Sequence, residues 1–115
     1  MHNSTINISV LLDKDKVPQQ INWNAADSSA EMDQKAKAMM LAFWDAADKS
    51  ALRIDLWTKE MMVDEMADFY YQTMMGMADS FERATHNKEL VADLKNFAKG
   101  FYKKFRDQQE KENKL

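Results

Sequence analysis

The chain has 115 residues, a formal net charge of −3 and no cysteine. This length predicts one domain with a core of its own. The lack of cysteine excludes disulfides, thiolate metal ligands and a cysteine nucleophile, and the acidic balance argues against nucleic acid as a partner. Ten methionines beside only two glycines and one proline predict long regular elements with an adaptable apolar interior or surface.

The chain begins with a predicted β-hairpin. Apolar and polar residues alternate over 5–12, which is typical of a half-buried strand. The polar run 13–16 predicts a turn, and the alternation resumes from Val17 to Trp23. Pro18 places this second strand at a sheet edge, because proline cannot donate a ladder hydrogen bond.

A helix is expected next. Ser28 and Glu31 have the spacing of a capping box, in which two side chains accept hydrogen bonds at a helix N-terminus. The apolar residues that follow recur on one helical face: Met32, Ala36, Met39, Met40 and Phe43. The polar segment 45–50 would connect this helix to a third strand over 52–57.

Two further helices are predicted in the second half of the chain. The first should span 63–84, and Asn87 should cap the second. Phe97 and Phe101 lie on the apolar stripe of the second helix and are expected to be buried.

These elements predict an α+β fold in the order β-β-α-β-α-α. A right-handed crossover through the first helix would place the third strand beside the first. The expected sheet is small, antiparallel and three-stranded, in strand order 2-1-3, with three helices on one face. Residues 1–105 would form a single α+β domain, and 106–115 a charged, disordered C-terminal tail.

No motif of a catalytic, metal or cofactor site appears in the sequence. His86 lies in a short polar link, where an exposed loop histidine is the expected role. Met74 and Met77 carry thioethers that could bind Cu(I), but they lie on the face that the helix needs for its core. We therefore predict no enzymatic activity, no cofactor and no bound metal.

One exposed cluster is the main candidate for a binding site. Alternation along the third strand turns Leu52, Ile54 and Leu56 inward, and it turns Arg53, Asp55 and Trp57 to the opposite face, followed by Lys59. A tryptophan framed by an arginine, an acid and a lysine is typical of a recognition patch. Equally, the indole could fold over the sheet edge or under a helix end.

A second candidate surface lies on the helix over 63–84. Tyr71 and Met75 form an apolar line beside the inner stripe of this helix. This line would contact either the following helix, which we favour, or a protein partner.

Several segments resemble one known family. LRIDLWTK at 52–59 is followed by VDEM at 63–66 and by MADSFERAT at 77–85. With Phe43-Trp44-Asp45 and the residues of 17–23, these segments resemble the gliding motility-associated protein GldC family over 5–105. Met62 departs from the proline that the family often has there. The resemblance implies a soluble cytoplasmic accessory of gliding bacteria, associated with surface-adhesin movement and its linked secretion machinery, and it implies no catalytic residue.

Two functions remain as alternatives. The first is a non-enzymatic adaptor that binds a protein of the motility or secretion machinery. The second is a chaperone-like carrier that holds apolar peptide segments on a methionine-rich helical surface. Either is compatible with a homodimer. We expect a cytoplasmic protein without direct membrane insertion, because the sequence lacks the pattern of a signal peptide and a sufficiently long apolar run.

Overall fold

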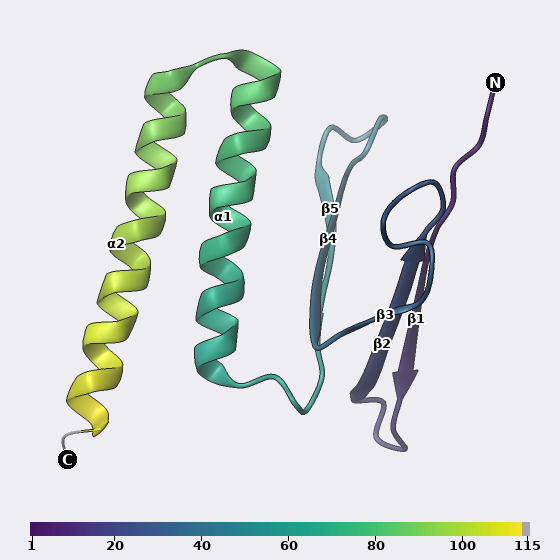
Figure 1. Cartoon of the computed structure of the whole chain (residues 1–115), viewed down its shortest axis with the longest axis horizontal. Coiled ribbons are helices and arrows are strands. Elements are labelled where there is room, and N and C mark those ends of the chain that lie inside the picture. Colours follow the sequence, from purple (N-terminus) through teal and green to yellow (C-terminus); the bar gives the residue numbers. More distant parts are fainter. Residues whose placement is uncertain (114–115) are drawn as a thin grey trace. The chain divides into compact units, whose positions relative to one another are not determined.

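The computed structural model describes residues 1–113, which divide into two compact units (Figure 1). One unit spans Met1–Met61 and contains all the strands, and the other begins at Met62 and contains both helices. The α+β class and the antiparallel pairing predicted from the sequence are confirmed. The elements are β1 (Ile6–Leu12), β2 (Pro18–Ala25), β3 (Gln34–Ala36), β4 (Ala38–Trp44), β5 (Ala51–Trp57), α1 (Val63–Thr85) and α2 (Lys88–Asn113).

The first sheet has three antiparallel strands in the order β1-β2-β3. β1 and β2 form the predicted hairpin, in which Val10 pairs with Ile21 and Ile8 with Trp23. These pairs share one apolar face of the sheet, because directly opposite residues point to the same side. Ile21 is its best buried member, with 1 % of its surface exposed.

The helix predicted to start near Ser28 is absent from the described structure, which has a turn and two strands there. Asp27 adopts a left-handed conformation with φ of 61°. The Ser28 hydroxyl donates to the Ala25 carbonyl at 2.7 Å and accepts from the Ala30 amide at 3.0 Å. Ser28 therefore stabilises a turn instead of a helix N-terminus, which is a common alternative use of serine hydroxyls.

Cross-strand pairing explains why the following residues are extended. Residues 38–44 are apolar on every side, and a short run of this kind fits a buried helix as well as a strand. β4 pairs antiparallel with β5 along its whole length, with Leu41 opposite Ile54. The predicted strand order 2-1-3 and the three-helix topology are therefore wrong: the strands form a β1-β2-β3 sheet and a separate β4-β5 sheet, and two helices follow.

The β4-β5 sheet has one face made only of apolar side chains. The predicted strand over 52–57 is confirmed as β5, but Leu52 and Ile54 remain exposed over 54 % and 52 % of their surface. The residues that share this face are Met39, Leu41, Phe43, Leu52, Ile54 and Leu56.

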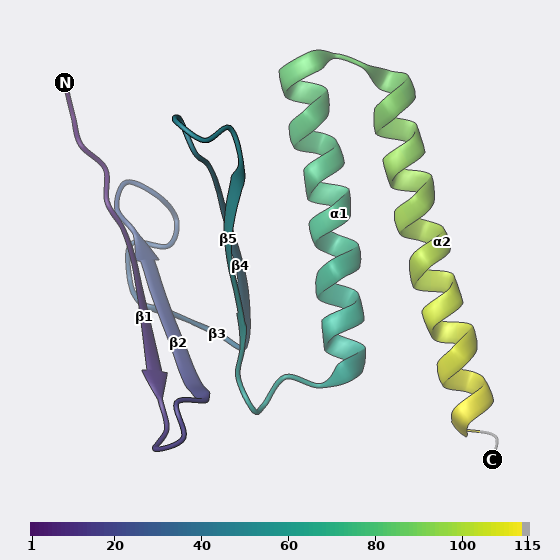
Figure 2. The same ribbon diagram turned by 180° about the vertical axis from the view of Figure 1, so that it is seen from behind.

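The two helices form an antiparallel hairpin, and both views show them side by side (Figures 1 and 2). His86 ends α1 in a left-handed conformation, and its amide donates to the Glu82 carbonyl at 2.8 Å. The Asn87 side-chain oxygen then accepts from the Leu90 amide at 3.2 Å, as a cap at the start of α2 does. Both helices predicted after residue 62 are confirmed, including the capping role of Asn87.

Small residues on the facing sides let the helices approach closely. Ala78 and Ala98 have no exposed surface. Phe97 and Phe101, by contrast, are exposed over 64 % and 38 % of their surface, so the prediction that both are buried is wrong. The aromatic stripe of α2 therefore lies away from the contact with α1.

The charged C-terminal segment is helical over most of its length. α2 continues to Asn113 and so includes 106–113, and the expected disorder of 106–115 stays a prediction. Residues 114 and 115 lie outside the described residues. The expectation of a single domain over 1–105 stays a prediction.

A substitution at the helix contact tests the packing of the hairpin. Ala98→Leu should destabilise the protein by about 1–3 kcal/mol, because a larger side chain must be forced into a filled position. Ala92→Leu is the matched control, since Ala92 is an exposed alanine of the same helix. Chemical denaturation measures both, and equal stability of the two variants would contradict a close helix contact at Ala98.

Candidate functional site

Three of the predicted binding residues lie together on one face of β5. Arg53 holds Asp55 in a two-point ion pair, with Nη2 at 2.9 Å from Oδ1 and Nε at 3.2 Å from Oδ2. Trp57 follows on the same face and is exposed over 57 % of its surface. The structure thus places an exposed indole beside an ordered ion pair.

Lys59 is directed to a different partner. Its ammonium forms an ion pair with Asp13 in the turn between β1 and β2. The hydrogen bond from Lys59 is the main cause that lowers the pKa of the Asp13 carboxyl below its usual value, and hydrogen bonds from the backbone of Val17 and Asp15 lower it further. Lys59 therefore fastens the end of β5 to the first hairpin.

The residue between Trp57 and Lys59 anchors this end of the strand. Thr58 is buried, and both its amide and its hydroxyl donate to the carbonyl of Lys37, at 2.7 and 2.9 Å. Lys37 is the single residue that separates β3 from β4. The end of β5 is thus bound to the junction of β3 and β4 directly after Trp57.

Strand pairing adds two residues that the sequence analysis missed. Met40 lies opposite Asp55, and Trp44 lies opposite Ala51. Both therefore share the face of the ion pair, and Trp44 is exposed over 71 % of its surface. They were missed because β4 was predicted to be a helix; the shortness of the apolar run is the signal that could have revealed a strand. We call this surface the tryptophan face, and its members are Met40, Trp44, Arg53, Asp55 and Trp57.

Tyr71 and Met75 belong to the helical hairpin. The Tyr71 ring lies 4.9 Å from the ring of Tyr102 on α2, tilted by 34°. Met75 lies one turn further along the same side of α1 and is half-buried. The structure therefore favours the interpretation in which this line contacts the neighbouring helix.

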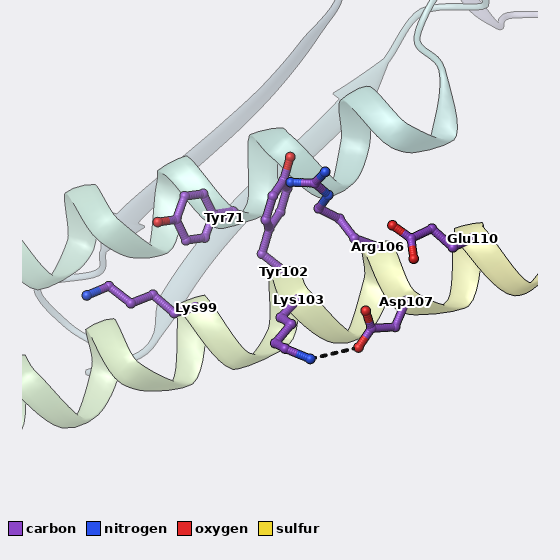
Figure 3. Close-up of a pocket in the computed structure, with 7 residues that line it drawn as sticks. All are labelled: Tyr71, Lys99, Tyr102, Lys103, Arg106, Asp107 and Glu110. Carbon is purple, nitrogen blue, oxygen red and sulfur yellow. Dashed lines mark hydrogen bonds and ion pairs between the residues drawn. The ribbon is translucent and has the colours of Figure 1, made fainter.

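A shallow cavity of about 360 Å³ opens beside this tyrosine pair (Figure 3). The Arg106 guanidinium lies 5.9 Å from the centre of the Tyr102 ring, and Lys103 forms an ion pair with Asp107 at 3.0 Å. This ion pair and this ring contact engage three of the charged side chains that line the cavity. The cavity is lined by Tyr71, Lys99, Tyr102, Lys103, Arg106, Asp107 and Glu110.

Within residues 1–113, no group of three or more histidine, cysteine or acidic side chains could hold a metal ion. Among the helices described, none is both long enough and apolar enough to span a bilayer.

One comparison with known proteins gives a match. A family model described as "Gliding motility-associated protein GldC-like" matches residues 18–107, which run from the start of β2 into α2. No curated protein and no solved structure matches the chain.

The tyrosine pair makes a testable pH prediction. A hydrogen bond with the Asp68 carboxyl, aided by burial, raises the pKa of Tyr102 above its ordinary 10.0. Since the raised pKa belongs to the folded state, the stabilisation from this bond is complete below the ordinary pKa and is lost as the pH rises through the folded pKa. Asp68→Ala should move the pKa of Tyr102 back toward 10.0 in a phenolate absorbance titration. The Tyr102→Phe variant lacks this phenol, so the transition that is missing from its titration belongs to Tyr102. If Asp68→Ala leaves that transition at the same pH, the hydrogen bond between Asp68 and Tyr102 is contradicted.

Proposed function

The chain belongs to the GldC-like family of gliding motility-associated proteins, and from that premise we propose that it is a non-enzymatic cytoplasmic adaptor. In this proposal it binds a protein of the motility or secretion machinery through the Trp57 end of the tryptophan face, which Arg53, Asp55 and Trp57 form. The observation that carries the proposal is the exposed indole of Trp57 beside the ordered pair of Arg53 and Asp55.

The composition of this face suits protein recognition. Tryptophan and arginine are the residue types that most often dominate binding energy, because they bury much surface or form several directed hydrogen bonds. Arg53 and Asp55 hold each other in one geometry, so less side-chain freedom is lost when a partner approaches. The exposed part of the Trp57 indole contributes little to the stability of this chain. A partner that covers it would gain apolar contact.

The anchoring of β5 supports the same role. Thr58 and Lys59 bind the β3–β4 junction and the first turn, respectively, directly after Trp57. A binding residue next to two fixed points keeps its position in the free protein. Such preorganisation favours affinity because less motion is lost on binding.

A chaperone-like carrier is the second candidate, and the surface of α1 favours it. Met77 and Phe81 lie one turn apart on the same side of α1, and both are exposed. Thioethers adapt to varied apolar sequences. A carrier would suppress the aggregation of several unrelated unfolded proteins, whereas an adaptor would bind one partner in its folded state. Light scattering of unfolding client proteins, with and without the chain, separates the two.

The adaptor proposal predicts that Trp57→Ala removes partner binding and keeps the fold. Loss of a central tryptophan typically costs an interface about 2–4 kcal/mol. In gliding cells, tagged wild-type and variant proteins would be crosslinked and captured, and their partners compared by quantitative mass spectrometry. Circular dichroism and thermal melting of the purified variant should remain close to those of the wild type.

Trp44→Ala is the matched control, because it removes an exposed indole from the same face at the opposite end of β4-β5. It should retain most of the partner capture. Retained capture by a folded Trp57→Ala variant would refute the assigned position of the interface, and a large loss of stability would show that Trp57 belongs to the core.

A further inference from the structure

We propose that β5 pairs antiparallel with β5 of a second copy of this chain, about a two-fold axis at Ile54. This inference concerns the outer edge of β5 and stands independently of the adaptor proposal. It gives the protein a defined self-association surface and a defined strand register.

The edge of β5 is suited to strand addition. In the part of the chain that is described, β5 is paired in a sheet with β4 alone, so its other edge has no strand neighbour. A two-stranded sheet is marginal by itself, and three or more strands with an apolar face are usually needed for stability. Pairing two copies through β5 would produce a four-stranded antiparallel sheet in the order β4-β5-β5-β4.

Charge complementarity points to a second copy as the occupant of this edge. With the axis at Ile54, Arg53 of each copy lies opposite Asp55 of the other, so the two-fold repeats the favourable pair. Opposite charges placed directly across antiparallel strands attract, and like charges repel. A self-complementary surface of this type is what a two-fold dimer requires.

The same charges exclude the neighbouring registers. An axis at Arg53 would place two arginines opposite each other, and an axis at Asp55 would do the same for two aspartates. An axis between residues would set Arg53 opposite an apolar side chain and break both faces of the sheet. The axis at Ile54 is therefore the register that the charges of β5 select.

The remaining positions of β5 agree with this register. Trp57 of one copy would lie opposite Ala51 of the other, so the large indole has a small neighbour. Leu52 would lie opposite Leu56, and Ile54 opposite Ile54. The apolar face of β4-β5, with its exposed Leu52 and Ile54, would thus continue across both copies without a polar interruption.

The test is a charge exchange on the full chain, measured by sedimentation equilibrium. Arg53→Asp and Asp55→Arg should each place two like-charge pairs in the interface and weaken self-association by about tenfold or more. An equimolar mixture of the two variants should form a heterodimer, because every opposed pair is then complementary. The double variant R53D/D55R should recover wild-type self-association.

Within one chain, each single exchange replaces the Arg53–Asp55 ion pair by two like charges on the same strand. The mixture of single variants controls for this, because each chain in it keeps its like-charge pair and only the pairs between chains become complementary. On β4, Arg53 pairs with Ala42 and Asp55 with Met40, which are both uncharged. Lys14→Asp in the β1–β2 turn is the control for a change in net charge and should self-associate like the wild type. Circular dichroism of each variant shows whether it is folded, and recovery in the double variant shows that the singles failed through charge.

Three results would overturn the proposal. The first is a wild-type chain that stays monomeric up to millimolar concentration, which would leave the edge to another protein. The second is self-association that the single exchanges do not weaken, which would place the interface on another surface. The third is a mixture of single variants that does not associate. None of these results bears on the adaptor proposal, because that proposal is tested by whether the Trp57→Ala variant still captures a partner.

Discussion

The antiparallel pairing of β4 with β5 is the interaction on which the rest of this structure depends. It converts an apolar run with no clear period into a strand, and it sorts the side chains of both strands onto two faces. One face has only apolar side chains, and the other has two tryptophans and an ion pair. The same pairing leaves the far edge of β5 open to another strand. The candidate binding face and the candidate dimer edge are therefore two results of one strand register.

The parts of the fold that were predicted correctly are those whose sequence pattern fits only one kind of secondary structure. Residues 5–10 alternate between polar and apolar side chains, and their hairpin partner follows after a polar turn. In the second half, an apolar stripe with helical spacing runs through 63–84, and Asn87 marks the next helix start with a side chain that caps it. At these places local chemistry and tertiary structure agree, so the sequence alone was sufficient.

The errors arose where a short sequence pattern is compatible with two different structures. Ser28 has the spacing of a capping residue, yet its hydroxyl stabilises a turn. The run 38–44 is apolar on both sides of the strand, so neither a two-residue nor a helical period can be seen in it, and only the distant partner β5 decides. Met40 and Trp44 were lost from the candidate site for this reason. Arg53, Asp55 and Trp57 were placed correctly on one face because their own strand alternates.

The double hydrogen bond at Lys37 has a mechanical consequence. Thr58 follows Trp57 directly and donates twice to one carbonyl at the β3–β4 junction. A pull on the indole would load the pairing of Trp57 with Ala38 on β4 together with these two bonds. The end of β5 could peel away only after all of them had broken, so a partner attached at Trp57 would be held by the sheet and by the β3–β4 junction at the same time.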